Sequence, residues 1–299
     1  MNPNPVLKKL GFSDRDRVVI IHADDIGLSH ACCVAFSDLW QVGIISSSAV
    51  MVPCPWFPKV AAYCRANPDV DVGVHLTLTS EWKTYRWGPI SSRDPATGML
   101  DQEGYFYHRS HDFQQHADPE AAAIEMRAQV ERAVAAGIPL THIDTHMGAV
   151  AHPKFMQSYI QLALGYRTPF LIFRLDEAGW RTIGLDADTA RFAAKLSHDL
   201  EAAGIPLLDG MVSLPLDGDP ARRMEQAKTT LAALRPGITH FIIHPAQDTP
   251  ELRAITPDWA CRVADYRTFL SDELAQFIRQ QGIHIIGYRR LKEVFPSPS

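Results

Sequence analysis

The chain has 299 residues, of which 46% are hydrophobic and 21% charged, and its net charge is −5 at pH 7. This is the composition of a globular protein long enough to bury a sizeable core. The mild acidity gives no indication of the basic surface by which proteins bind nucleic acid or anionic membranes. No stretch approaches the ~18 uninterrupted apolar residues of a membrane-spanning helix. The opening stretch, MNPNPVLKKLGFSDRD, lacks the apolar core of a secretion signal.

The cysteines point to a reducing environment. There are five, an odd number that cannot all pair with one another, and none forms a CxxC motif: Cys32, Cys33, Cys54, Cys64 and Cys261. Reduced thiols in a cytoplasmic protein are therefore expected.

Strand-like runs alternate with helix-like segments along the whole chain. The expected strands are 17–23, 44–52, 70–79, 140–146, 169–175, 206–214, 238–244 and 283–288. The expected helices lie near 30–42, 55–66, 119–136, 153–165, 188–203, 219–234 and 262–281. Eight β/α alternations predict an α/β protein with a parallel sheet, closed as a TIM-like (β/α) barrel, with a doubly wound open sheet as the alternative.

The longest irregular stretch, about 80–117, follows the third expected strand. It is rich in aromatic residues, namely Trp82, Tyr85, Trp87, Tyr105, Phe106 and Tyr107. Loops of this length inside a domain are usually functional or disordered, and the aromatic residues favour an ordered, functional loop. Because no linker interrupts the chain, we expect a single domain over 1–299 that carries this stretch as a loop insertion.

Four expected strands pair an apolar face with a face that bears histidines and carboxylates. Because side chains alternate along a strand, the residues that share the polar faces are His22 with Asp24, His75 with Thr77, His142 with Asp144 and His146, and His240 with His244. Helices cover the outside of such a sheet, so the outer face must be apolar. The polar faces are therefore expected to line the interior.

Several of these polar residues lie at the carboxyl ends of strands, where barrel enzymes place their catalytic groups. Asp24, Asp25, His146 and His244 occupy such ends, and His75 lies slightly deeper. Neighbouring residues of a regular strand face opposite ways, so Asp24 and Asp25 can serve one site only if the strand has already ended.

Each residue also has a structural interpretation. The two aspartates could end a strand and cap the next helix, His75 could be a hydrogen-bonded core residue, and His142, Asp144 and His146 could form a structural trio. The structural interpretations are less convincing when all these residues are considered together, because buried charges are costly unless they are paired or bound to metal. A cation reconciles several carboxylates and histidines in one interior.

One aspartate and two histidines with open positions suit a catalytic divalent metal such as Zn²⁺, Co²⁺, Mn²⁺ or Fe²⁺. Such a metal polarises a carbonyl group and lowers the pKa of bound water to about 7. A second carboxylate would then serve as general base, and a further histidine would protonate the departing amine. The pattern therefore favours hydrolysis of an amide or ester.

Five motifs in a fixed order, HADDIGLS, GVHLTLTSEW, THIDTHMG, FRL and HFIIHPA, span roughly Val18 to Tyr288. In this order they resemble the YdjC/ChbG (also HpnK-like) family of carbohydrate deacetylases. The resemblance implies a deformed (β/α) barrel that removes acetyl groups from N-acetylated sugars, such as chitooligosaccharides. It also implies one divalent metal ion, for which we expect Zn²⁺ or Mg²⁺ before Co²⁺, Mn²⁺ or Fe²⁺.

Matched motif by motif, the resemblance implies that Asp25, His75 and His146 bind the metal and that Asp24 is the base. It implies that His244 is the proton donor or a residue that stabilises the transition state, and that Arg174 belongs to the site. We expect Arg174 and Trp82 to contact substrate, and His142 and Asp144 to support the metal ligands from behind.

The chain departs from the family pattern in two places. Many members carry further histidines after the position of His146, where this chain has Met147, Ala149 and Val150. Ile26 replaces a phenylalanine that is common in the first motif. No expected ligand is lost, so these departures affect the choice of substrate rather than the metal site.

Other functions use similar features. A metal-dependent sugar isomerase or endonuclease would draw more carboxylates from later strands, where this chain offers Asp176, Glu177 and Asp209. A non-catalytic sugar-binding protein would explain the aromatic loop but gives Asp24 no role beside Asp25. The expected partner is an N-acetylated saccharide, not nucleic acid or a membrane, and a homo-oligomer is compatible with the sequence.

Overall fold

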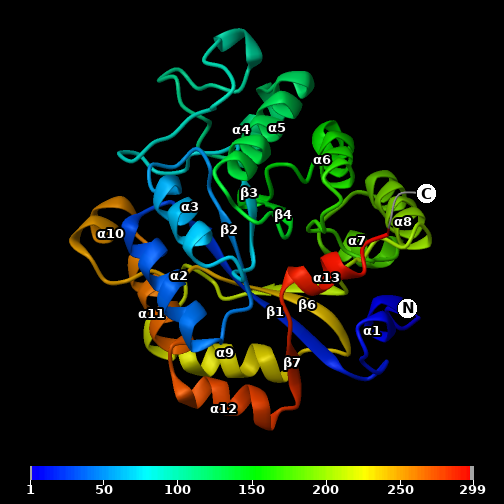
Figure 1. Cartoon of the computed structure of the whole chain (residues 1–299). Helices are drawn as coiled ribbons and strands as arrows, with labels where there is room; N and C mark the ends of the chain where they lie inside the picture. The colour runs from blue at the N-terminus through cyan, green and yellow to red at the C-terminus, as the bar shows by residue number, and fades with distance from the viewer. Residues whose placement is uncertain (1, 297–299) are drawn as a thin grey trace.

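The protein is built on a curled parallel sheet, seen in a computed structural model that describes residues 2–296 (Figure 1). The strands are β1 (Arg17–Ile26), β2 (Ser47–Val50), β3 (Val72–Leu76), β4 (Ile143–Thr145), β5 (Gly210–Ser213), β6 (Gly237–Ile243) and β7 (Ile283–Ile285). They lie in the order β4-β3-β2-β1-β6-β5, and β7 pairs with the first residues of β1. Every pairing is parallel.

Helices connect successive strands and surround the sheet (Figure 1). They are α1 (Pro5–Lys9), α2 (His30–Val42), α3 (Phe57–Ala66), α4 (Ser110–His116), α5 (Pro119–Ala135), α6 (Pro153–Gly165), α7 (Glu177–Thr182), α8 (Ala187–Ala202), α9 (Arg223–Ala232), α10 (Pro250–Ile255), α11 (Trp259–Phe269), α12 (Asp272–Gln280) and α13 (Tyr288–Glu293). The single helix expected near 262–281 is in fact two, α11 and α12. The Ser271 side chain caps α12 by accepting a hydrogen bond from the Leu274 amide.

The α/β class and the parallel sheet are confirmed, but the described residues form seven strands rather than eight. The segment expected as a strand at 169–175 makes only two single bridges, Phe170 with Ile143 and Phe173 with Leu208. Pro169 has no N–H to donate, and the segment leaves β4 after one bridge to reach the residues before β5. The sheet is therefore a half-barrel whose remaining side is irregular. It fits the deformed barrel that was expected, but not a closed barrel of eight strands.

Strand β1 carries two kinds of side chain into the interior. Val18 and Ile20 belong to an apolar cluster at the amino-terminal end of the sheet, where α1 packs, together with Val6, Leu7, Leu10, Leu208, Ile238, Ile286, Tyr288 and Leu291. His22 and Asp24 follow on the same face, toward the carboxyl end, and are also buried. The alternating residues Val19, Ile21 and Ala23 pack in the larger outer core. The expected polar inner face is therefore found in the carboxyl half of β1, at His22 and Asp24, and the expected apolar outer face along Val19, Ile21 and Ala23.

The stretch 80–117 contains a 3-10 turn, η1 (Pro95–Thr97), and α4. Polar contacts tie it to the rest of the molecule: the Trp87 indole donates to the Thr79 carbonyl at 2.7 Å, and the Glu125 carboxylate accepts from the Ser91 amide at 2.8 Å. Phe106 is fully buried. The stretch is thus packed against the sheet and α5, and its treatment as an insertion in a single domain stays a prediction.

The structure bears on the cysteines and on membrane spans. All five cysteines are free and buried. Among residues 2–296, no helix combines the length and apolar character required to cross a bilayer.

The contact between β3 and β4 leaves no room for a side chain at Gly73. A Cβ atom there would lie 2.3 Å from the His142 carbonyl oxygen and 2.5 Å from its Nδ1. We expect Gly73→Ala to lower the free energy of unfolding by about 1–3 kcal/mol, the usual cost of overpacking. Urea denaturation checks this. Gly210→Ala, where a Cβ meets nothing within 4 Å, is the matched control, and an equal loss in both variants would contradict the steric explanation.

Candidate metal centre and active site

The two aspartates at the end of β1 reach one site because the strand is bulged. Between Ala23 and Ile26 the pairing with β2 slips by one residue, and Asp25 adopts a φ of 63°. Such a bulge turns neighbouring side chains to one side, and aspartate tolerates the left-handed region better than most residues. The sequence predicted a strand over 17–23 that ends before the two aspartates, and this boundary is wrong. In the structure β1 continues through the bulge to Ile26.

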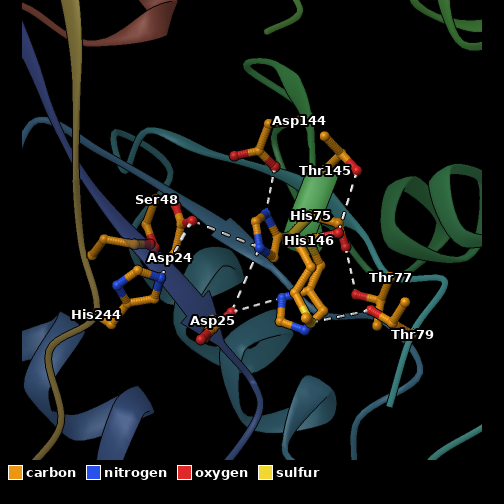
Figure 2. Close-up of polar contacts among 12 residues, drawn as sticks. Asp24, Asp25, Ser48, His75, Thr77, Thr79, Asp144, Thr145, His146 and His244 are labelled. Carbon is orange, nitrogen blue, oxygen red and sulfur yellow. Dashed lines mark hydrogen bonds and ion pairs between the residues drawn. The ribbon is translucent and has the colours of Figure 1, made fainter. Parts of the chain in front are cut away.

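The side chains of Asp25, His75 and His146 converge at the carboxyl ends of three strands (Figure 2). Asp25 Oδ1 lies 3.5 Å from His75 Nε2 and 3.2 Å from His146 Nδ1. All three residues are buried. Within the described residues, Asp25 Oδ1 has no hydrogen-bond partner. The three residues expected to bind metal are thus brought together around a buried carboxylate oxygen that lies within ion-pair distance of both imidazoles but accepts no hydrogen bond within the described residues.

A carboxylate holds the far nitrogen of each histidine. Asp144 Oδ1 lies 2.7 Å from His75 Nδ1, and Glu81 Oε2 lies 3.0 Å from His146 Nε2. A carboxylate can only accept, so these ring nitrogens donate. The other nitrogen of each ring faces Asp25. Carboxylate–histidine pairs of this kind orient metal-binding histidines in many proteins.

The electrostatics of the site favour an additional positive charge. Burial opposes a charge on His75, but Asp144 and Asp24 raise the pKa of that imidazole well above its usual value. Burial likewise opposes a charge on His146, yet Glu81 and Asp25 raise its pKa to about 9. A divalent cation between these residues would meet the same demand. One carboxylate and two imidazoles with the remaining positions open is a donor set that fits a catalytic divalent metal.

Arg262 on α11 anchors the other oxygen of Asp25. Its Nη1 donates to Asp25 Oδ2 at 2.8 Å, and its Nε donates to Asp258 Oδ1 at 2.8 Å. Burial would raise the pKa of Asp25, but the Arg262 guanidinium and the neighbouring histidines lower it well below its usual value. Asp25 is therefore held as a carboxylate with one oxygen restrained and one free.

Asp24 is oriented separately. His22 Nδ1 donates to Asp24 Oδ1 at 2.6 Å, whereas Oδ2 faces His75 Nε2 at 3.8 Å and His244 Nε2 at 3.9 Å. Burial opposes ionisation, but His75 and the hydrogen bond from His22 lower the pKa of Asp24. This arrangement leaves Oδ2 as an ionised proton acceptor at the site.

Beneath Asp24 lies a layer of buried histidines, namely His22, His142 and His240. His22 Nε2 lies 2.9 Å from His142 Nε2, and the His142 ring stacks on Tyr288 with centroids 4.0 Å apart. Burial, followed by the charge of neighbouring histidines, lowers the pKa of His142 well below its usual value. Burial lowers that of His240 to about 3. His142 therefore supports Asp24 through His22. Asp144, by contrast, accepts a hydrogen bond directly from His75, one of the expected metal ligands.

The other expected site residues divide into two groups. His244 and Trp82 line the same cavity as Asp24 and Asp25, a space of about 720 Å³. His244 is partly exposed, but its Nδ1 is buried and has no partner within the described residues, and burial lowers its pKa. The Arg262 guanidinium lies 5.6 Å from the centroid of the Trp82 ring.

Arg174 is not brought to this cavity. Its Nε donates to Glu201 at 2.7 Å and its Nη1 to Asp209 at 3.1 Å. Asp209 also accepts from the amide of Ile238, near the amino-terminal end of β6. The buried guanidinium thus joins elements at the end of the sheet opposite the aspartates. The expectation that Arg174 contacts substrate is corrected, because its charge is already paired there.

Sequence reasoning missed Arg262, Glu81 and the positioning contact of His22. Glu81 lies inside the motif GVHLTLTSEW, so its position two residues after Thr79 was a usable signal. His22 shares a strand face with Asp24, which was also visible. Nothing in the local sequence marks Arg262, since it lies on a helix 237 positions from the aspartate that it binds.

The chain is similar to known proteins over most of its length. A family model described as YdjC-like protein matches residues 18–280. A carbohydrate deacetylase of Thermus thermophilus is 31% identical over 288 residues, which cover 96% of this chain and 98% of that protein. A carbohydrate deacetylase of Thermoanaerobacter pseudethanolicus is 26% identical and covers 92% of this chain and 100% of its own.

A solved structure from Enterococcus faecalis V583 has the same fold. It superposes with a TM-score of 0.74 at 21% identity, covering 92% of this chain and 99% of its own. Its description suggests cellobiose-phosphate cleavage for that protein. At this identity the likeness establishes the fold alone.

The contact of Glu81 with His146 generates a test of the metal centre. Glu81→Gln removes the charge behind His146, and we expect it to weaken binding of Zn²⁺ by about 10–100-fold, as loss of such supporting contacts does elsewhere. Titration calorimetry on metal-free protein measures the affinity. Glu131→Gln, at an exposed position of α5, is the control. Unchanged affinity in Glu81→Gln would mean that His146 needs no support from this carboxylate.

Proposed function

Because this chain belongs to the YdjC-like protein family, we propose that it is a metal-dependent hydrolase that removes acetyl groups from N-acetylated sugars. The observation that carries the proposal is Oδ1 of Asp25, which accepts no hydrogen bond within the described residues and lies between two histidines, each of which is held by a carboxylate. A second carboxylate, Asp24, lies in the same cavity. Relatives named carbohydrate deacetylases supply the chemical class of substrate.

Asp25, His75 and His146 would hold the metal. A divalent cation there would polarise the acetyl carbonyl and acidify the water that attacks it. Two imidazoles and one carboxylate favour Zn²⁺ over Mg²⁺, since Mg²⁺ prefers oxygen ligands. Asp24 accepts the proton of the attacking water at Oδ2, because His22 occupies Oδ1 and holds the carboxylate in place.

His244 delivers a proton to the departing amine in this proposal. A low pKa makes its imidazole neutral at rest and a strong proton donor once charged. Asp24 Oδ2, 3.9 Å from His244 Nε2, is the neighbour that can pass on the proton it has taken from water. The alternative role, stabilising charge on the substrate oxygen, uses the same nitrogen and is separated from proton donation by experiment below.

The proposal includes an N-acetylated mono- or oligosaccharide as the substrate and the aromatic face of Trp82 as a contact for it. A cytoplasmic location is proposed as well, supported by five free, buried thiols. The isomerase alternative has no specific support, because Asp209 binds Arg174 away from the cavity. A purely sugar-binding protein would leave the orientation of Asp24 by His22 without a purpose.

Substitution of the two aspartates is expected to impair the enzyme in different ways. Asp25→Asn should weaken metal binding, because it removes the charged ligand. Asp24→Asn should keep the metal but lower kcat by about 10²–10⁴-fold, the usual contribution of a positioned general base. Metal content is measured by atomic emission and turnover by acetate release from N-acetylglucosamine oligomers.

Chelation of the metal should abolish turnover, and added Zn²⁺ should restore it. Full turnover in verified metal-free protein would sink the proposed function.

His244→Ala separates the two roles of this histidine. An amide needs a protonated leaving group, whereas an activated ester does not, so loss of a proton donor should reduce amide hydrolysis by about 10²–10⁴-fold and ester hydrolysis far less. The comparison uses an N-acetyl sugar and an aryl acetate with the same enzyme preparation. Equal losses on both would assign His244 to oxyanion or substrate binding.

A further inference from the structure

A chain of hydrogen bonds runs from Asp24 through the interior toward the opposite end of the sheet. His22 connects Asp24 to His142, with contacts of 2.6 and 2.9 Å. Beyond them, His142 Nδ1 lies 3.1 Å from Thr141 Oγ1, which in turn lies 2.7 Å from Asp71 Oδ1. All five residues are buried. The chain thus links the proposed base to a second carboxyl group, which directly precedes β3 at its amino-terminal end.

The number of protons in this chain decides the direction of its bonds. The chain has four contacts, and each needs one proton, because two acceptor atoms cannot hydrogen-bond to each other. A neutral imidazole supplies one proton and a hydroxyl supplies one, so His22, His142 and Thr141 together supply three. If Asp24 and Asp71 are both ionised, the chain is one proton short. A buried polar atom would then lose its hydrogen bond, which is costly.

The fourth proton fits best on Asp71. Placed there, it lets Asp71 donate to Thr141, and Thr141 then donates to His142 Nδ1. His142 can donate from Nε2 to His22, which keeps its Nδ1 proton for Asp24. A proton on His22 instead would leave a charge on that imidazole and another on Asp71, and buried charges are costly.

The surroundings of Asp71 agree with a protonated carboxyl group. Burial raises the pKa of Asp71 above its usual value, against hydrogen bonds from the Arg289 amide, Thr141 and Ser47. An un-ionised carboxyl group can still accept from the Arg289 amide at 2.7 Å and from Ser47 at 2.9 Å. The charged or titratable side chains near Asp71 are His142, Tyr288, Arg289 and Lys292.

The two cations near Asp71 donate to backbone carbonyl groups. The Arg289 guanidinium donates to the Val70 carbonyl at 2.7 Å, and Lys292 Nζ donates to the Leu140 carbonyl at 2.7 Å. Asp71 therefore lacks the close cationic partner that keeps Asp25 ionised through Arg262.

Resting on the proposed function, in which Asp24 is the general base, we infer that Asp71 is a positioning residue that acts on Asp24 through the chain. Its proton makes His22 donate to the Asp24 carboxylate. With Asp71 ionised, Thr141 would donate to it and His142 would donate to Thr141. His22 would then donate to His142 and present a bare Nδ1 to Asp24, 2.6 Å away. The orientation of the base thus depends on a proton held at the far end of the chain.

NMR of Zn²⁺-loaded protein with ¹⁵N-labelled histidine reads the protonation of each ring nitrogen directly. At pH 7 we expect His22 to carry its proton at Nδ1 alone and His142 to carry its proton at Nε2 alone. The signals are assigned by their loss in His22→Gln and His142→Gln. A His22 ring protonated at both nitrogens, or a His142 ring protonated at Nδ1, would mean that Asp71 is ionised and would overturn the inference.

A matched pair of substitutions separates the chain from ordinary packing. Thr141→Val breaks the chain, whereas Ser47→Ala removes a buried hydroxyl that donates to the same oxygen of Asp71 from outside the chain. Thr141→Val should lower kcat for acetate release by about 10–100-fold, as loss of supporting contacts does elsewhere, without changing the Zn²⁺ affinity. Ser47→Ala should leave kcat unchanged. Equal losses in the two variants would assign the effect to packing and contradict the inference.

Asp71→Asn tests the proton itself. An amide donates as a carboxylic acid does but cannot ionise. Because its oxygen is needed by the Arg289 amide, its N–H group faces Thr141. We expect Asp71→Asn to keep the histidine protonation pattern of the wild type, and a changed pattern would count against a proton on Asp71. The spectra need no substrate, so they judge the inference even if no N-acetylated sugar releases acetate, a result that counts against the proposed function alone.

Discussion

The burial of charged groups inside a parallel sheet is the constraint on which the rest of the structure depends. Asp24, Asp25 and Asp144 are almost completely buried, and each is paired with a histidine or an arginine. Ionised groups remain charged in such surroundings only when partners offset the loss of water. The partners therefore decide where each carboxylate oxygen points, and they direct Oδ1 of Asp25 toward His75 and His146, where the candidate metal centre lies.

The interior is layered along β1, and each layer supports the next. Val18 and Ile20 pack in an apolar base that α1 helps to form. His22 stands above them and joins His142 to Asp24. Because the histidines of this layer are buried, His142 and His240 stay neutral and accept or donate hydrogen bonds without adding charge. The layer gives Asp24 a fixed orientation while the charges remain at the carboxyl end of the sheet.

The cavity above these layers is divided between two kinds of chemistry. One end presents carboxylates and histidines, and the other presents the apolar side chains of α7 and α8. The departures from the family pattern lie between them, since Met147 and Val150 line the cavity in this chain. The two ends therefore rest on different interactions: the candidate metal centre depends on paired charges, whereas the surface beside it depends on uncharged side chains.

The sequence by itself determined the local part of this result. The alternation of side chains along strands placed His22 and Asp24 inside, and the order of strand ends brought Asp25, His75 and His146 to one edge, because these are properties of short segments in a parallel sheet. Only the tertiary structure decided the rest. The bulge at Asp25 depends on pairing with β2, the guanidinium of Arg262 arrives from α11, and Arg174 pairs with Asp209 instead of facing the cavity. The absence of a regular strand at 169–175 also depends on distant segments. Phe170 pairs with Ile143, whereas Phe173 pairs with Leu208, so no continuous ladder forms. Contacts between distant segments are fixed by packing, which no pattern within one segment records.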